Sequence, residues 1–379
     1  MSFACWNWNL RGSVYHASVP ANIGRPGRGY PNCVIALALL FALRLTPAEP
    51  GEYKQPQLAA SDKLVALAFG SGNWIYFSSS RDGGRTFARP VKAVELPGLM
   101  LGRHRGPRIA ITRDAIVVSA ISNQQGDLVA WRSTDVGHTW TRGVAANQTP
   151  RSANEGLHSM VSLPDGSLYA TWLDTPGKGK RLMGARSDNG GATWSKNLII
   201  YQSPDGTICE CCHPSLTVTP GGELHAMWRN ALAGDRDMYT AVSHDGGRSF
   251  GAAAKVGMGS WHLQACPMDG GGIVITSNGK LAATFRRQQE VFLAQDGQAE
   301  TLLATGKDPA IAANSEGVFV AWSGPEGLLA KVPGSSEPLR LDAEGAFPQL
   351  IALPNGPVLA AWEHKGEIEF QRLTTNPTK

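Results

Sequence analysis

Hydrophobic and polar residues alternate along most of this chain, in a unit that recurs seven times. Each unit has an alternating run, a turn that usually carries Gly, Asp or Asn, and a second alternating run that mostly ends near an aromatic residue. The clearest copies read MVSLPDGSLYATW, LTVTPGGELHAMW, IVITSNGKLAATF, AIAANSEGVFVAW and LIALPNGPVLAAW, and the two earlier versions read PQLAASDKLVALAF and PRIAITRDAIVVSA. Alternation with a period of two residues is typical of strands with one buried face. The units begin near residues 56, 107, 157, 213, 270, 308 and 347, and they predict an all-β protein.

A second motif, Ser-x-Asp-x-Gly-x-Thr/Ser-aromatic, occurs four times. The copies are SRDGGRTF (80 to 87), STDVGHTW (133 to 140), SDNGGATW (187 to 194) and SHDGGRSF (243 to 250), with Asn189 replacing Asp in the third. The Asp or Asn side chain can accept hydrogen bonds from nearby backbone amides, while glycine can adopt a positive φ. The motif closely resembles the Asp-box, or BNR repeat, of the sialidase-like β-propeller superfamily.

This resemblance implies a β-propeller in which each unit forms one four-stranded blade. Sialidases have six blades, whereas the repeats in this chain predict seven. A six-bladed ring, with one unit absorbed into a neighbouring blade, is the alternative. The Asp-boxes would share one face of the propeller, and the loops that join successive blades would lie on the opposite face, where varied residues on a rigid scaffold favour function.

The length and charge of the chain add two limits. A chain of 379 residues is compatible with one large all-β domain, which we assign to residues 49 to 379. The net charge of +4 is spread along the sequence without a block of lysine and arginine, so nucleic acid is not an expected partner.

Residues 1 to 48 are predicted to be an N-terminal extension and signal peptide. Arg25 and Arg28 precede an apolar run from Val34 to Leu43, and Thr46-Pro47-Ala48 offers a small-residue cleavage site. The run is shorter than the roughly 20 residues of a membrane span. We therefore expect an exported protein, periplasmic or secreted, with no stable membrane span after cleavage.

Four cysteines would remain in the mature chain, and three of them lie within four positions. The loops CECCHP (209 to 214) and ACPMDG (265 to 270) precede the innermost strands of neighbouring blades, so their sulfur atoms would meet beside the central channel. Disulfides are one interpretation in an exported protein, and a redox-active disulfide is another. A soft-metal site for copper or zinc is the third, because soft ligands select soft ions. Its candidate ligands are Cys209, Cys211, Cys212, Cys266, Met268 and either His213 or His262.

The resemblance to sialidases also implies candidate residues for an acidic sugar. Sialidases have a Phe/Tyr-Arg-Ile-Pro motif, further arginines that clamp the carboxylate, an Asp acid/base and a late Tyr nucleophile. Here the nearest equivalent of the motif is Arg108-Ile109-Ala110, and no tyrosine follows Tyr239. Carboxylates from Asp269, Asp237 or Glu363 would have to act instead. The catalytic candidates for a glycosidase are Asp269, Arg108, Arg229 and Arg287, and Arg105, Arg236 and Asp237 are further candidates for ligand binding.

The chain is also similar to bacterial exported BNR-repeat proteins that share the Cys-x-Cys-Cys element and a later Cys-Pro loop. That similarity supports one shared site without naming a reaction. We predict a propeller that binds a soft metal or a small anionic ligand at a site rich in cysteine and arginine. An exo-α-sialidase-like hydrolase acting on acidic sugars is the alternative, and a protein-interaction platform with structural disulfides is the second alternative.

Overall fold

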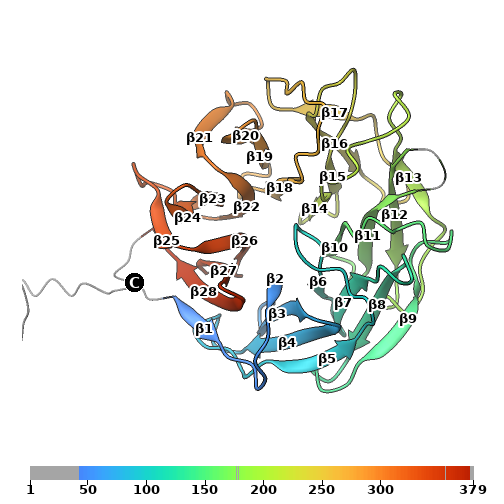
Figure 1. The fold of residues 1–379 in the computed structure, drawn as a ribbon, viewed down its shortest axis with the longest axis vertical. Helices are drawn as coiled ribbons and strands as arrows, with labels where there is room; N and C mark the ends of the chain where they lie inside the picture. The colour runs from blue at the N-terminus through green and yellow to red at the C-terminus, as the bar shows by residue number, and fades with distance from the viewer. Residues whose placement is uncertain (1–41, 176, 178, 355, 376–379) are drawn as a thin grey trace, which may run out of the picture. The chain divides into compact units, whose positions relative to one another are not determined.

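The computed structural model describes residues 42 to 175, 177, 179 to 354 and 356 to 375. This part of the chain contains 28 strands and no helix, and the strands form seven four-stranded antiparallel sheets around one axis (Figure 1). The predicted all-β propeller is therefore confirmed, with seven blades rather than six. Because there is no helix in the described residues, none of them forms a helix that could cross a membrane.

Each of the first six blades is built from four consecutive strands, innermost first. Blade one has β2 (Lys54–Ser61), β3 (Leu64–Ser71), β4 (Trp74–Ser80) and β5 (Val91–Glu95). Blade two has β6 (Arg108–Ile111), β7 (Ile116–Ile121), β8 (Leu128–Ser133) and β9 (Thr141–Ala145). Blade three has β10 (His158–Ser162), β11 (Leu168–Asp174), β12 (Arg181–Ser187) and β13 (Leu198–Tyr201). Blade four has β14 (Ser215–Val218), β15 (Leu224–Arg229), β16 (Met238–Ser243) and β17 (Ala254–Val256). Blade five has β18 (Gly272–Ile275), β19 (Leu281–Arg287), β20 (Glu290–Gln295) and β21 (Thr301–Thr305). Blade six has β22 (Lys307–Asn314), β23 (Gly317–Gly324), β24 (Gly327–Lys331) and β25 (Leu339–Asp342).

The seventh blade joins the two ends of the propeller. It contains β26 (Gly345–Ala352), β27 (Val358–His364) and β28 (Glu367–Leu373), and its outermost strand is β1 (Leu43–Leu45), which pairs with β28. Leu45 is buried in a hydrophobic cluster that blades seven and one share. Strand β1 lies upstream of the predicted cleavage point near residue 48, so cleavage there would leave the blade with three strands. The earlier part of the predicted signal peptide, up to residue 41, lies outside the described residues.

Aromatic residues at the ends of the second strands fill the space between blades. Trp172, Trp228, Trp322 and Trp362 are all fully buried. They are the tryptophans that end the alternating runs of the sequence, so the same pattern that predicts the strands also supplies the core. Replacing one of them with alanine is expected to cost about 3–5 kcal/mol.

The Asp-boxes form the turns between the third and fourth strands of the first four blades. In the first box, Ser80 Oγ lies 2.7 Å from Asp82 Oδ1, and the backbone N–H of Thr86 donates to the same oxygen at 3.0 Å. Gly83 and Gly84 have φ of 70° and 71°, a left-handed conformation that side chains disfavour. The box is thus a turn held by its own residues, as the motif predicts.

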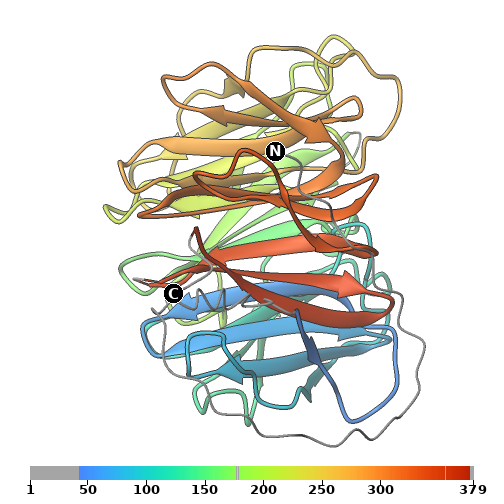
Figure 2. The same cartoon turned by 90° about the vertical axis from the view of Figure 1, so that its left-hand side faces the viewer.

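The innermost strands β2, β6, β10, β14, β18, β22 and β26 surround the axis (Figure 1), and the strands run between the two faces of the ring (Figure 2). We call the face where these seven strands begin the mouth, and the face with the Asp-boxes the box face. Further along the same strands the channel is lined largely by apolar residues, including Leu58, Ile111 and Val274. Polar side chains are therefore concentrated at the mouth.

Candidate functional site at the mouth of the propeller

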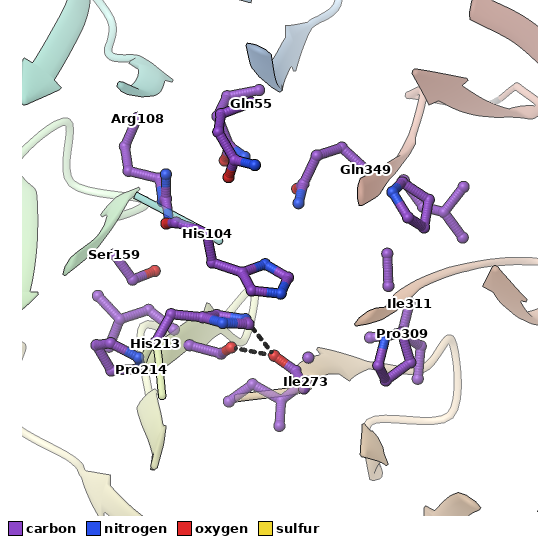
Figure 3. Close-up of a pocket in the computed structure, with 18 residues that line it drawn as sticks. Gln55, His104, Arg108, Ser159, His213, Pro214, Ile273, Pro309, Ile311 and Gln349 are labelled. Atoms are coloured by element: carbon purple, nitrogen blue, oxygen red, sulfur yellow. Dashed lines mark hydrogen bonds between the residues drawn. The ribbon is translucent and has the colours of Figure 1, made fainter. Parts of the chain in front are cut away.

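The mouth contains an axial cavity of about 190 Å³ to which all seven innermost strands contribute (Figure 3). Its polar lining consists of Gln55, Gln57, His104, Arg108, Ser159, His213, Ser215 and Gln349. No Asp, Glu or Tyr lies among the described residues that line it. The cavity therefore offers amides, hydroxyls, imidazoles and one guanidinium to a ligand.

His104 and Asp308 form a buried pair at this cavity. His104 Nε2 lies 2.9 Å from Asp308 Oδ1, and the two residues are 7% and 6% exposed. The carboxylate accepts the Nε2–H, which leaves Nδ1 of a neutral ring as a free acceptor. Both residues have positive φ, 66° for His104 and 52° for Asp308. Non-glycine residues in this conformation cluster at functional sites, where the surrounding structure holds them.

A second imidazole lies against His104. The rings of His104 and His213 stack with centroids 4.2 Å apart and an interplanar angle of 29°. His213 Nε2 donates to the carbonyl of Gly271 at 3.0 Å, and its Nδ1 is buried without a partner among the described residues (Figure 3). Burial, with the nearby His104 and Arg108, holds the pKa of His213 well below its usual value. His213 is therefore neutral.

Asp269 lies behind this pair and is 1% exposed. Its Oδ2 accepts the backbone N–H of Asp308 at 2.8 Å, whereas its Oδ1 is buried and has no hydrogen-bond partner among the described residues. Burial, followed by the repulsion of Asp308, raises the pKa of Asp269. Arg286 Nε is 3.7 Å from Asp269 Oδ2. Asp269 thus holds the backbone of Asp308 at the mouth and does not itself line the cavity.

Arg229 holds three loops of the mouth together. It is 2% exposed, and its guanidinium donates to the carbonyls of Asp269 at 3.0 Å, Arg236 at 2.6 Å and Arg286 at 2.9 Å. Its own carbonyl accepts the N–H of Cys209 at 3.1 Å. Arg229 therefore connects the loop of the cysteine cluster to the loop of Asp269, and its hydrogen bonds are made to backbone.

The three clustered cysteines lie together, buried and not joined by disulfides. The Sγ atoms are separated by 3.3 Å between Cys209 and Cys212, 3.8 Å between Cys209 and Cys211, and 3.9 Å between Cys211 and Cys212. The side chain of Met268 packs against this trio. Hydrogen bonding within the trio lowers the pKa of Cys209, and Arg229 lowers it further. Hydrogen bonding to Cys209 raises the pKa of Cys211, and burial raises the pKa of Cys212. The trio therefore favours one thiolate.

Arg108 contributes a buried positive charge to the lining of the cavity. Its guanidinium donates to the carbonyls of Gly106, Pro107 and His104, the last at 2.7 Å. It forms no ion pair with any of the described carboxylates, and burial lowers its pKa to about 10. A buried charge without a counter-charge is costly and is therefore a mark of a ligand site.

The remaining residues predicted for the site lie elsewhere or are engaged by neighbours. Arg287 pairs with Glu300 at 2.5 Å, and Arg105 donates to the carbonyl of Glu155 at 2.7 Å. Asp237 pairs with Lys255 at 2.7 Å, and Arg236 donates to the carbonyl of Leu263 at 3.3 Å. His262 is exposed beside Asp235 at 3.3 Å, and Cys266 is exposed. Cys266 does not belong to the group of sulfur atoms that lie within 4.8 Å of one another.

Sequence reasoning placed His104 and Asp308 in loops of this face without assigning them a role, and it did not select the glutamines of the cavity. A local signal for the mouth exists, because five innermost strands have a proline just before or near their first residues: Pro56, Pro107, Pro214, Pro309 and Pro348. The residues before three of these prolines are Gln55, His213 and Asp308, all of which lie at the mouth. A Pro at the start of a repeat unit therefore locates a mouth residue one position earlier.

Residues 115 to 358 match the BNR repeat-like domain family, which is more than half of the chain. The chain belongs to this family. No curated protein matches this BNR-repeat propeller. Among solved structures, the α-L-arabinanase of Penicillium chrysogenum, complexed with arabinobiose, is similar with a TM-score of 0.55 and 12% identity, over 88% of this chain and 98% of that one.

Two further structures have comparable similarity. An inactive variant of virginiamycin B lyase from Staphylococcus aureus has a TM-score of 0.56 and 14% identity, over 88% of this chain and 99% of that one. The Hadza microbial sialidase Hz136 has a TM-score of 0.50 and 15% identity, over 86% of this chain and 66% of that one. Identities this low establish a shared fold and leave the chemistry to the residues at the mouth.

Proposed function

We propose that this BNR-repeat propeller binds a soft metal ion, copper(I) or zinc, through Cys209, Cys211 and Cys212. The spacing of the three sulfur atoms carries the proposal. Thiolates bound to one tetrahedral zinc at about 2.3 Å are separated by roughly 3.8 Å from each other. The separations of 3.8 Å and 3.9 Å agree with this value, and the third, 3.3 Å, is within reach of a small adjustment.

The separation of the sulfur atoms and the neighbouring residues favour the same interpretation. A disulfide would use only two of the three sulfurs and requires a separation of about 2.05 Å. Met268 packs on the trio, and its thioether, a ligand that favours copper(I) over harder ions, would bind in exchange for the hydrogen bond that its Sδ accepts from Arg103 Nη1 at 3.2 Å. Arg229 also lies close enough to stabilise negative charge on Cys209. The proposed ligand set is therefore three thiolates with Met268.

Metal analysis of protein purified without chelator tests this function. We expect about one copper or zinc ion per chain, and loss of that ion in the Cys211→Ser variant because two thiolates hold such ions weakly. Cys266→Ser is the matched control and should keep the metal, since Cys266 is exposed and separate from the trio. Metal that persists in Cys211→Ser, or a wild-type protein with every cysteine oxidised and no metal, would contradict the proposal.

A second candidate function is the binding of a small anionic ligand in the axial cavity. The unpaired guanidinium of Arg108 favours it, since three of the five N–H groups donate to carbonyls and two are left for a ligand. Amides and hydroxyls around it suit the hydroxyl groups of an acidic sugar. We expect calorimetric binding of galacturonate or N-acetylneuraminate to weaken at least about tenfold in Arg108→Lys, which keeps the charge and loses the forked geometry.

The hydrolase alternative has weaker support. Glycoside hydrolysis commonly needs two carboxylates, or a tyrosine with a carboxylate, on either side of the scissile bond. The described lining of the cavity has none of these groups, and Asp269 is buried outside that lining.

The platform alternative needs structural disulfides, whereas the four described cysteines are free. We also propose that the protein is exported, either to the periplasm or out of the cell. This part of the proposal rests on the N-terminal sequence alone.

A further inference from the structure

His104 is placed as a base in the axial cavity, and neither proposed function uses it. Its Nε2–H is held by Asp308 at 2.9 Å, and its Nδ1 makes no hydrogen bond with the described residues. The ring projects into the space between the innermost strands (Figure 3). A neutral imidazole with one nitrogen fixed by a carboxylate and the other free is the arrangement that general-base catalysis requires.

We infer that His104 removes a proton from the carbon next to the carboxylate of a bound uronate, which leads to β-elimination. This inference rests on the anionic ligand proposed for Arg108. The two residues are close, because the guanidinium of Arg108 donates to the backbone carbonyl of His104 at 2.7 Å. A carboxylate bound by Arg108 would therefore present its adjacent carbon near the imidazole. The guanidinium also stabilises the negative charge that develops as the proton leaves.

The composition of the cavity selects elimination over hydrolysis. Hydrolysis would need a pair of acidic residues or a tyrosine, which the described lining does not provide. Elimination next to a carboxylate needs a base and a cation, and His104 and Arg108 supply both. Nε2 of His213 donates to the carbonyl of Gly271 and its Nδ1 is buried, so His213 does not compete as the base.

The proposed step balances without a further reactant. Nδ1 of His104 takes the proton from the ring carbon that bears the carboxylate. The electron pair of that C–H bond forms a double bond to the next carbon, whose bond to the linking oxygen breaks. The oxygen leaves with its electron pair and takes a proton from water, and the resulting hydroxide takes the proton from His104. The products are an unsaturated uronate and a shortened sugar chain.

Asp308 acts as a positioning residue. Its carboxylate fixes the ring of His104, and its own backbone N–H is bound by Asp269 at 2.8 Å. In Asp308→Asn the side chain can present an amide N–H to Nε2, which favours the tautomer with the proton on Nδ1. The proton would then occupy the atom that must accept one. Nitrogen chemical shifts of the His104 ring report this change directly, and a purely structural role of Asp308 would not produce it.

The test incubates the full chain with 4-linked oligogalacturonate and oligoglucuronate in D2O. We expect the ultraviolet absorbance of the conjugated product, and deuterium in recovered uronate at the carbon next to the carboxylate. His104→Asn, a residue that tolerates the left-handed backbone, should lower both rates at least about 100-fold with unchanged binding. His138→Gln, on the exposed box face, is the matched control and should leave the rates unchanged.

The outcomes separate the two proposals. In one outcome, the wild type binds the oligomers and Arg108→Lys binds them more weakly, yet neither product nor deuterium exchange appears. That result would refute the role of His104 as a base and support the binding of an anionic ligand by Arg108. If His104→Asn folds, as judged by its melting temperature, and keeps the rate, His104 is not the base. If calorimetry detects no binding of either oligomer to the wild type, both the ligand and the reaction are refuted.

Discussion

The two faces of the propeller differ in how their polar groups find partners. On the box face the hydrogen bonds that build each turn are local, such as those that join Ser80 and Thr86 to Asp82, two and four residues away. Arginines of the preceding blade add one bond each to the third and fourth boxes. At the mouth the partners are far apart in sequence: 39 residues separate Asp269 from Asp308, and 204 separate His104 from Asp308. Each Asp-box turn can therefore form within one repeat, whereas the mouth exists only when several blades meet.

The pKa values of carboxyl groups are also shifted in opposite directions on the two faces. In the boxes, hydrogen bonds from the turn lower the pKa of Asp82 and stabilise its ionised form. At the mouth, burial raises the pKa of Asp269 and of Glu363. Arg108 forms no ion pair with a described carboxylate. Oδ1 of Asp269 has no hydrogen-bond partner among the described residues. The Asp-box turns satisfy most of their own polar groups, whereas the mouth leaves polar groups without partners that the ligand we propose would engage.

The largest expected effect comes from removing Arg229 at the mouth. Arg229→Ala would leave three buried carbonyls without donors, and we expect a loss of about 4 kcal/mol in the free energy of unfolding. Denaturant titration measures it. Arg132→Ala is the matched control, since Arg132 makes one hydrogen bond to the carbonyl of Asn189 near the box face, and should change stability by less than about 0.5 kcal/mol. Equal effects in the two variants would contradict the distinction between the faces.

A moderate effect is expected from a single box. Asp82→Ala removes the acceptor for Ser80 and Thr86 in an accessible turn, so we expect a loss of about 1 kcal/mol. Metal content and ligand binding should stay at the wild-type level, because all the broken contacts are local. Denaturant titration and metal analysis on the same preparation check both parts. A fall in metal content would show that the two faces are coupled.

The opposite pKa shifts predict opposite dependences of stability on pH. Because the folded-state pKa of Asp82 is lowered, its contribution is present above the unfolded pKa of about 3.9 and is lost as pH falls below it. Because the folded-state pKa of Glu363 is raised by burial, its contribution declines as pH rises above about 4.3. Melting temperatures from pH 3 to 7 should therefore fall less on acidification in Asp82→Asn and less on neutralisation in Glu363→Gln. Identical profiles for wild type and both variants would reject this assignment.

The fold was predictable from sequence because its signals are local. Alternating runs, the turns between them and the buried tryptophans recur at short range, and they predict seven blades correctly. The adjacency of Cys209, Cys211 and Cys212 is equally local. Cys266 belongs to a different blade, and the prediction that it joins the trio depended on a geometry that repeats do not specify.

The pair of His104 and Asp308 was out of reach for the same reason. Nothing in the sequence relates a histidine before the second blade to an aspartate in the first strand of the sixth until those blades meet. The position of a charged residue at the end of a strand is also not enough to predict a site residue. Arg287 lies at the end of β19, but it pairs with Glu300 and does not line the cavity. The position of a residue in the repeat unit predicts on which face of the propeller it lies. The orientation of its side chain depends on packing between blades.

Strand β1 has a consequence for how the protein is made. It is synthesised before the other described strands and pairs with β28, which is synthesised after them, so the ring cannot close until β28 has been made. The contacts between His104 and Asp308, and between Arg229 and Asp269, depend on blades synthesised at different times. A nascent chain can finish individual sheets, and the three clustered cysteines lie within one loop. The axial cavity that we propose as a ligand site is complete only when all seven innermost strands have been made.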